Sequence, residues 1–146
     1  MPRRQTMPPP EPPPGEPTSN RPLVLVVDDE EPIRVLLERD LTNRGFDVVA
    51  VPSATHAFGK LLDLPRVDCV VSDQRMRGAT GVYLLDYVAT EWPQCGRVIH
   101  TGYPDDVESF FAHSVVAKPA TLDEIDQAIR NEIRLRRRAS PSRPTA

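Results

Sequence analysis

Five short runs of apolar, largely β-branched residues alternate with segments of helical periodicity, and this alternation limits the fold more than any other feature of the chain. The runs cover residues 23–27, 46–51, 67–72, 97–101 and 114–117. The first and third runs are almost continuously apolar, which is typical of strands covered on both faces. The pattern therefore predicts an α/β fold in which a parallel sheet lies between helical layers.

The first interval between strands has a clear helical signal. Its apolar residues recur on one helical face, at Ile33, Leu36, Leu37 and Leu41. Pro32 suits the first turn of this helix, and Gly45 suits the position just after its end. An amphipathic helix is thus predicted directly after the first strand.

The other intervals carry weaker but consistent signals. Further helices are predicted over 53–63, 81–91 and 121–138. Ser53 is the expected N-cap of the second helix. Thr121 and Glu124 have the spacing of a capping box at the start of the last one.

Five parallel strands joined by helices predict a flavodoxin-like, doubly wound sheet with the strand order 2-1-3-4-5. The crossovers are expected to be right-handed, and because the strands are parallel they all end at the same edge of the sheet. Ligands bind in such folds at the carboxyl ends of the strands, where strands 1 and 3 are neighbours. The functional residues are therefore expected at this edge.

Three acidic residues lie at the predicted ends of these two neighbouring strands. Asp28 and Asp29 follow the first strand, and Asp73 follows the third. Three carboxylates in one pocket repel one another and should raise the pKa of at least one of them. Mg2+ takes oxygen ligands and removes this conflict, so a magnesium site is predicted here. Glu30 and Glu31 are instead expected to interact favourably with the helix dipole in the first turn.

A hydroxyl and an ammonium group end the remaining strands. Thr101 ends the fourth strand, and Lys118 follows the fifth. Beside a carboxylate–metal site, these groups suit the stabilisation of a phosphoryl group on Asp73. A carboxylate can itself be the nucleophile, which would give an aspartyl phosphate.

The segments VDDEEPIR, VVSDQRM, GVYLL, VIHTGY and KPATLDEIDQAI occur in this order over about residues 23–133. In these segments the chain resembles the receiver domain of bacterial two-component response regulators. The resemblance implies that Asp73 accepts a phosphoryl group from a sensor histidine kinase or a histidine phosphotransfer protein. It also implies that Thr101 and Lys118 contact that phosphoryl group.

The resemblance further implies how the cofactor, Mg2+, would be held. Asp29 and Asp73 would ligate the ion directly, together with the main-chain carbonyl of Arg75. Asp28 would act mostly through water. Arg75 and Tyr103 each lie two residues beyond a site residue, and their long side chains are predicted to slow hydrolysis of the phosphoryl group by obstructing water.

Two departures from the family pattern affect the expected output. Thr101 and Lys118 are only 17 positions apart, which is shorter than usual, so the fifth helix is expected to be short and to cover about 105–111. Val115 stands where the family tends to have a Tyr or Phe that reports phosphorylation. A partner face is therefore predicted at Phe110, Phe111 and Val115. Adjacent residues of one helix cannot both face inward, so one Phe is expected to be exposed, and burial of both at the helix end is the alternative.

The chain is expected to divide into three parts. Residues 1–21 are predicted to form a disordered arm, locally in polyproline II, because nine of the seventeen prolines fall within the first 22 residues. A linker or a ligand for a proline-recognition domain are both compatible with this composition. Residues 22–137 are the predicted receiver domain, and 138–146 a disordered tail.

These expectations define the function classes. The chain is predicted to be a stand-alone response regulator that signals by phosphorylation-dependent contact with a downstream protein target, or relays phosphate, and not an enzyme that turns over an outside substrate. The alternative is a pseudo-receiver that binds proteins without being phosphorylated. The sequence is compatible with a homodimer. Nucleic-acid binding is not expected at a net charge of −3, and a cytoplasmic location fits two cysteines without metal spacing and the lack of a long apolar run.

Overall fold

A computed structural model describes residues 20–139 of the chain. Its elements follow one another as β1 (Leu23–Val27), α1 (Glu31–Asn43), β2 (Asp47–Val51), α2 (Ala54–Asp63), β3 (Cys69–Ser72), α3 (Gly81–Glu91), β4 (Gly96–Thr101), the 3-10 helix η1 (Pro104–Asp106), β5 (Ser114–Ala117) and α4 (Leu122–Ala139). The strands form one parallel sheet in the order β2-β1-β3-β4-β5. The predicted sheet and its order are confirmed.

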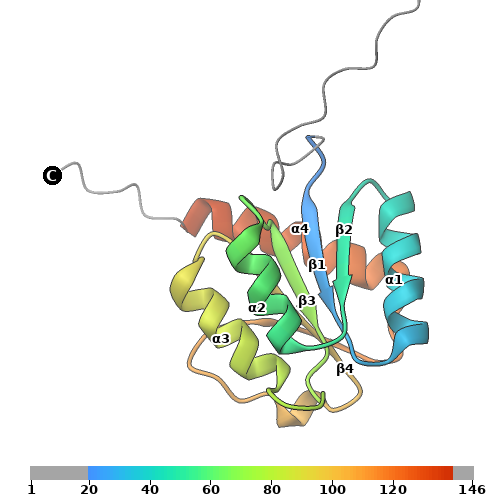
Figure 1. Ribbon diagram of the computed structural model, residues 1–146, viewed down its shortest axis with the longest axis vertical. Coiled ribbons are helices and arrows are strands. Elements are labelled where there is room, and N and C mark those ends of the chain that lie inside the picture. The colour runs from blue at the N-terminus through green and yellow to red at the C-terminus, as the bar shows by residue number, and fades with distance from the viewer. Residues whose placement is uncertain (1–19, 140–146) are drawn as a thin grey trace, which may run out of the picture.

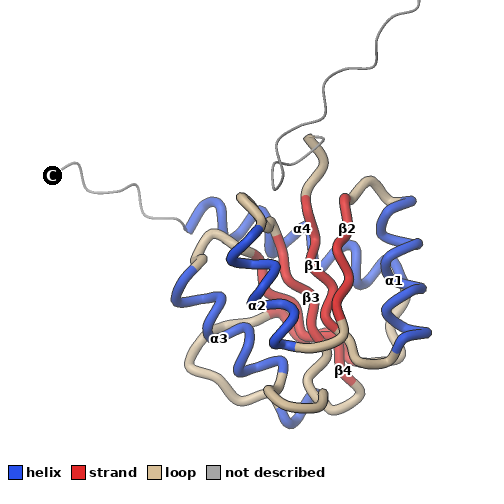
Figure 2. The backbone as a smooth tube through the Cα atoms, viewed as in Figure 1, coloured by secondary structure: helices blue, strands red, loops and turns tan. Residues whose placement is uncertain are grey.

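Helices cover the sheet on both of its faces (Figures 1 and 2). On one face, α1 and α4 pack their buried leucines and isoleucines against residues of β1, β3, β4 and β5. On the other face, α2 and α3 pack against residues of β1, β2, β3 and β4. β1, β3 and β4 are buried along their whole length, which explains the almost continuously apolar sequence of β1 and β3.

The local signals in the sequence operate as predicted. Ser53 accepts a hydrogen bond from the backbone N–H of His56 and caps α2, and Thr121 accepts one from the N–H of Glu124 at the start of α4. Gly45 follows α1 with a φ of +102°, a left-handed conformation that glycine adopts at little cost. The Ser53 and Thr121 caps fix where α2 and α4 begin at the functional edge of the sheet, and Gly45 ends α1 at the opposite edge.

The expected fifth helix over 105–111 is wrong. The described residues contain four α-helices, and only η1 occupies part of this interval. In this segment a backbone N–H group bonds to a side chain and not to a carbonyl one helical turn earlier. The Ser109 hydroxyl accepts the N–H of Phe111. His113 then fixes the end of the segment by bonding the Asp86 carboxylate through Nε2, at 2.6 Å, and the Arg97 guanidinium through Nδ1, at 3.0 Å.

The described residues, 20–139, extend only two positions beyond each end of the predicted domain, 22–137. α4 continues to Ala139, two positions past the predicted boundary at 137. Most of the predicted N-terminal arm and most of the predicted C-terminal tail lie outside the described residues. Within residues 20–139, no helix combines the length and the apolar character that a bilayer-crossing segment requires.

Candidate functional site

The three predicted carboxylates meet at the carboxyl ends of β1 and β3. One ligand oxygen from each of Asp28, Asp29 and Asp73 lies within 4.8 Å of the other two. Parallel pairing of β1 with β3 brings them together, since Val27 is the register partner of Ser72. A compact set of carboxylate oxygens fits the ligand preference of Mg2+. The predicted position of the main-chain carbonyl of Arg75 as a further ligand stays a prediction.

Backbone hydrogen bonds hold each carboxylate in place. Asp28 accepts from the N–H of Glu30 at 2.9 Å, and Asp73 accepts from the N–H of Gln74 at 2.7 Å. Asp29, the exposed member, accepts from the N–H of Arg77 at 3.3 Å. The β1–α1 and β3–α3 turns thus orient the carboxylates before any ligand binds.

Lys118 bridges the two buried carboxylates. Its Nζ lies 3.4 Å from Asp28 Oδ2 and 3.4 Å from Asp73 Oδ2. The lysine is largely buried. It follows the edge strand β5, and its side chain extends from there to place a positive charge at the site. The ammonium group therefore lies beside the carboxylates, as expected from the position of Lys118 after the fifth strand.

The cluster also raises the pKa of one of its acids, as the sequence suggested. The pKa of Asp28 lies above its ordinary value of 3.8 chiefly because the carboxyl group is buried. The hydrogen bond from Glu30 and the charge of Lys118 act in the opposite direction, and repulsion from Asp73 contributes less than burial does. Desolvation, rather than the repulsion invoked from the sequence, is therefore the leading cause.

Thr101 occupies the predicted strand end but has a local partner. Its hydroxyl accepts the N–H of Tyr103 at 3.0 Å, and its carbonyl accepts the N–H of Lys118 at 2.8 Å. The residue is fully buried between β3 and β5. Contact between this hydroxyl and a phosphoryl group stays a prediction, but Thr101 and Lys118 are tied together through the backbone.

Arg75 and Tyr103 are in direct contact above the site. The Arg75 guanidinium lies 3.3 Å from the centroid of the Tyr103 ring, in a cation–π arrangement. Arg75 Nε also donates to Asp106 at 2.7 Å. The sequence placed these two side chains near the site, but it did not predict that they join the β3–α3 turn to η1.

Two site residues were missed by the sequence analysis. The Gln74 side chain is buried and accepts the N–H of Val82, which fastens the start of α3 to the site. Gly81 donates its N–H to the Gln74 carbonyl at 3.0 Å, and a Cβ built on it would lie 2.2 Å from the Asp73 carbonyl oxygen. The sequence held one signal for Gly81. A helix can normally begin with a residue that has a side chain, so a glycine at the start of the predicted helix indicated a lack of space.

The predicted partner face is exposed on the β5 side of the molecule. Phe110 is fully exposed, and Phe111 and Val115 are about two-fifths exposed. The Phe111 ring stacks on His113 at a centroid distance of 6.2 Å. Exposure of one Phe was expected; both are exposed, so the alternative of two buried rings is wrong. Partner binding at this face stays a prediction.

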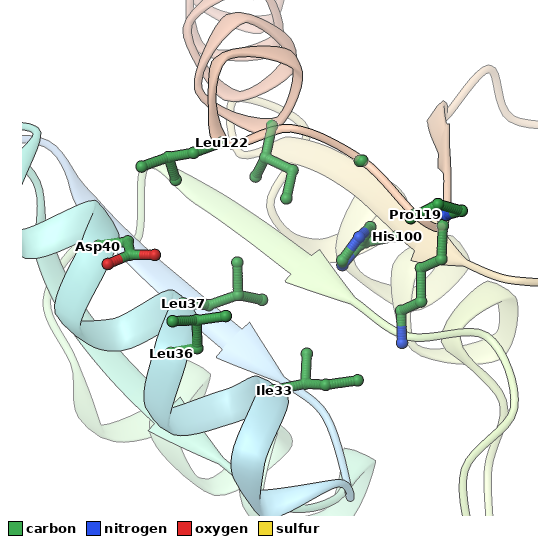
Figure 3. A pocket seen from close by; sticks show the side chains of 10 residues that line it. Ile33, Leu36, Leu37, Asp40, His100, Pro119 and Leu122 are labelled. Carbon is green, nitrogen blue, oxygen red and sulfur yellow. The ribbon is translucent and has the colours of Figure 1, made fainter.

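An apolar groove opens beside the site between α1 and the segment that follows β5. It has a volume of about 430 Å³ and is lined mainly by apolar side chains of α1 and α4. Ile33, Leu36 and Leu37 project from α1 toward Leu122, with His100 and Pro119 across the groove (Figure 3). Leu36 was predicted to face the core, yet it is 46% exposed because it forms the groove wall.

We expect His100 to make the stability of the fold depend on pH. The residue is buried, and its Nδ1 has no hydrogen-bond partner among the described residues. Burial, with a smaller contribution from the charge of Lys118, lowers the pKa of His100 from 6.5 to about 4. The unfolded chain therefore binds the proton first as the pH falls. The free energy of unfolding should drop between pH 6.5 and about 4, by about 3 kcal/mol for this residue.

Denaturant unfolding at a series of pH values measures this effect. The His100→Leu variant should lose most of that pH dependence, while His56→Gln, a change at an exposed histidine, should keep it. An unchanged slope in His100→Leu would contradict the assignment.

Comparison with known proteins gives a consistent result. The family model for the response regulator receiver domain matches residues 24–130. The hydrogenase transcriptional regulatory protein HoxA of Cupriavidus necator is 35% identical over 116 residues, which are 75% of this chain and 24% of HoxA. The chain spans about a quarter of the length of the first curated relatives that it matches.

Solved structures agree with the fold. The signal receiver domain of an HD domain-containing protein from Pseudomonas fluorescens Pf-5 is 25% identical, with a TM-score of 0.73 over 80% of this chain and 98% of that one. The response regulator TrrA from Thermotoga maritima, solved in complex with Mg(2+)-BeF, is 26% identical, with a TM-score of 0.68 over 75% of this chain and 97% of that one.

Proposed function

This chain belongs to the response regulator receiver domain family, and on that premise we propose that Asp73 accepts a phosphoryl group from a phosphohistidine in a Mg2+-dependent reaction. The donor is a sensor histidine kinase or a histidine phosphotransfer protein. The phosphorylated chain then signals by contact with another protein or passes the phosphoryl group on. The observation that carries the proposal is the convergence of Asp28, Asp29, Asp73 and Lys118 at one edge of the sheet.

The chemistry follows from the groups present. A carboxylate oxygen of Asp73 attacks phosphorus, the P–O bond forms as the P–N bond to the donor imidazole breaks, and the imidazole leaves with the bonding electron pair. Asp73 Oδ1 is held by the N–H of Gln74, so Oδ2 is the oxygen better placed to attack. Lys118, 3.4 Å from Oδ2, can follow the new phosphoryl oxygen and balance its charge.

The acidic residues supply what the cation needs. Asp28, Asp29 and Asp73 would hold Mg2+, with the main-chain carbonyl of Arg75 as a further ligand. When bound, Mg2+ neutralises negative charge on the phosphoryl oxygens during transfer. Thr101 would donate its hydroxyl hydrogen to a phosphoryl oxygen. Its oxygen already accepts the N–H of Tyr103 at 3.0 Å, and one hydroxyl can accept and donate at the same time.

Mass spectrometry after incubation with acetyl phosphate tests the proposal. We expect the mass of one phosphoryl group to be added in the presence of Mg2+ and not in the presence of EDTA. If no mass is added with acetyl phosphate or with phosphohistidine donor proteins, the chain is a pseudo-receiver and the proposal is wrong.

The contact between Arg75 and Tyr103 supports a role in phosphoryl lifetime. The Arg75 guanidinium lies 3.3 Å from the Tyr103 ring centroid and is anchored to Asp106, so the pair would obstruct the approach of water to Asp73. In the double variant Arg75→Ala, Tyr103→Ala, we expect dephosphorylation to be about tenfold faster, because the attacking water is no longer obstructed. Phosphate release from the phosphorylated protein measures the rate. Arg77→Ala, which removes a neighbouring exposed charge, is the control and should leave the rate unchanged; an unchanged rate in the double variant would refute this role.

The groove beside the site is a suitable docking surface for the donor protein, because it combines exposed apolar side chains with Lys118, whose amine lies 3.4 Å from Asp73 Oδ2. We expect Leu36→Asp to slow transfer from a phosphohistidine protein about tenfold or more, since an apolar contact is replaced by a charge. Transfer from acetyl phosphate, which needs no docking, should be unaffected. Val35→Asp is the matched control, because Val35 is similarly exposed on α1 but lies outside the groove. Equal effects of the two variants would exclude the groove as the docking surface.

A further inference from the structure

A second apolar groove lies on the opposite face of the molecule, between α2 and α3. We call it the aromatic groove and define it by Phe58, Leu62, Tyr83, Tyr87 and Trp92, which line a hollow of about 220 Å³. Its side chains contribute to neither the acidic site nor the α1 groove. Leu62 is 74% exposed and Tyr83 is 61% exposed, so the groove presents apolar surface to solvent.

The rings of this groove form a continuous series of contacts. Phe58 meets Tyr83 and Tyr87 edge-on, at centroid distances of 6.4 and 5.0 Å, and Tyr87 meets Trp92 at 6.0 Å. Tyr83 is 61% exposed and Tyr87 is 45% exposed, so much of the surface of these rings remains open to solvent. Open tyrosine and tryptophan faces are the surface that proline-rich segments in polyproline II bind.

We propose that the groove binds the proline-rich segment of this same chain, residues 8–14, which read PPPEPPP. Such a segment favours polyproline II, whose backbone is already extended and loses little entropy on docking. Its carbonyl groups have no internal partners, and the Tyr83 and Tyr87 hydroxyls and the Trp92 indole N–H are donors that can reach such carbonyls. The chemistry of the segment therefore complements that of the groove.

The chain enters the described structure close to this groove. Arg66, which follows α2, donates from Nη2 to the carbonyl of Arg21 at 3.5 Å. Arg66 and Trp92 line a common hollow of about 500 Å³ at the end of the sheet where β1 begins. Trp92 thus belongs both to the hollow beside the incoming chain and to the aromatic groove.

The covalent connection is long enough for docking. Pro14 precedes Asn20 by six residues, which span about 19 Å in polyproline II. The whole of α3, with 11 residues, is about 16 Å long. The tether also gives the segment an effective concentration near the millimolar range, so even a weak site would be occupied.

A spin label on the arm tests the proposal in the intact chain. The label is attached at Thr6→Cys, beyond the far end of the proline segment. The native thiols of Cys69 and Cys95 are buried, and burial raises the pKa of Cys95 to about 12 and that of Cys69 also, so neither competes for the label. We expect NMR signals of Tyr83, Tyr87 and Phe58 to be broadened, and those of α1 to be unaffected.

Two variants make the result specific. Replacing all six prolines of the segment by serine keeps the tether length and should abolish the broadening, and replacing Pro141 and Pro144 in the C-terminal tail should not. Tyr87→Ala, a change at a half-exposed position, should reduce the broadening at the remaining rings. The fluorescence of Trp92, the only tryptophan of the chain, gives a second readout, with emission shifting to longer wavelength in the serine variant.

A mixture of spin-labelled protein with unlabelled, isotopically enriched protein separates the possible occupants. Broadening within one molecule supports the proposal. Broadening that appears between molecules would assign the groove to a second copy, and broadening spread evenly over the surface, or unchanged in the serine variant, would show that the segment does not dock there. Either result overturns the proposal without affecting phosphorylation at Asp73.

Discussion

Asp73→Asn should abolish the Mg2+-dependent addition of a phosphoryl group, reducing it by roughly a thousandfold or more relative to the unchanged chain. The amide has nearly the shape of the carboxylate, but it is neutral and a poor nucleophile. Mass spectrometry after incubation with acetyl phosphate measures the result. If the mass increment persisted, another residue would have to be the acceptor.

The same substitution should leave the fold intact, and this separates loss of chemistry from loss of structure. Lys118 keeps Asp28 as a partner at 3.4 Å, and removal of the Asp73 charge relieves one contribution that raises the pKa of Asp28. The thermal midpoint of Asp73→Asn should therefore equal or exceed that of the unchanged protein. Mg2+ binding should weaken and still be measurable, because Asp28 and Asp29 remain.

Gly81→Ala is expected to have the largest effect of any conservative change near the site. The new Cβ would lie 2.2 Å from the backbone carbonyl oxygen of Asp73 and 3.2 Å from Cα of Gln74, so backbone, not a flexible side chain, would have to move. We expect a loss of about 3 kcal/mol in the free energy of unfolding, at the upper end of the usual cost of overpacking. Phosphorylation should also fall steeply, because the Asp73 carboxylate moves with its backbone.

Gly59→Ala is the matched control for this change. Gly59 lies within α2, and a Cβ there would meet no atom within 4 Å. Alanine favours the helix over glycine by up to about 1 kcal/mol, so this variant should be slightly stabilised and fully phosphorylated. Chemical denaturation and the phosphorylation assay together give both results. If both variants behaved alike, the close approach of α3 to Asp73 would not be a constraint.

The strands, their order and the acidic cluster could be predicted because local signals and topology act in the same direction. Apolar runs set β1, β3 and β4, and the parallel order alone brings Asp28 and Asp73 together. Lys118 was placed for the same reason, since it follows the last strand. These features depend on backbone pairing, which the sequence pattern expresses directly.

The segment between β4 and β5 could not be predicted in the same way. Its shape depends on contacts between side chains far apart in sequence, such as His113 with Asp86 and Arg97. The local pattern predicted a helix over 105–111, but hydrogen bonds to distant side chains stabilise a different backbone conformation in this segment. The role of Gly81 was missed for a related reason, because its constraint is the nearness of the Asp73 carbonyl and not its own conformation.

Lys118 is bonded both through its side chain and through its backbone, and this has a consequence for how β5 can move. Its amine holds two acids in the middle of the sheet, while its backbone N–H is bonded to Thr101 on β4. If the amine shifts toward a new phosphoryl oxygen, it must pull on the four-residue strand β5 at the margin of the sheet. The displacement of Lys118 would then be passed along the main chain of the edge strand. Val115 could be displaced in this way, although it has no aromatic ring that changes its orientation.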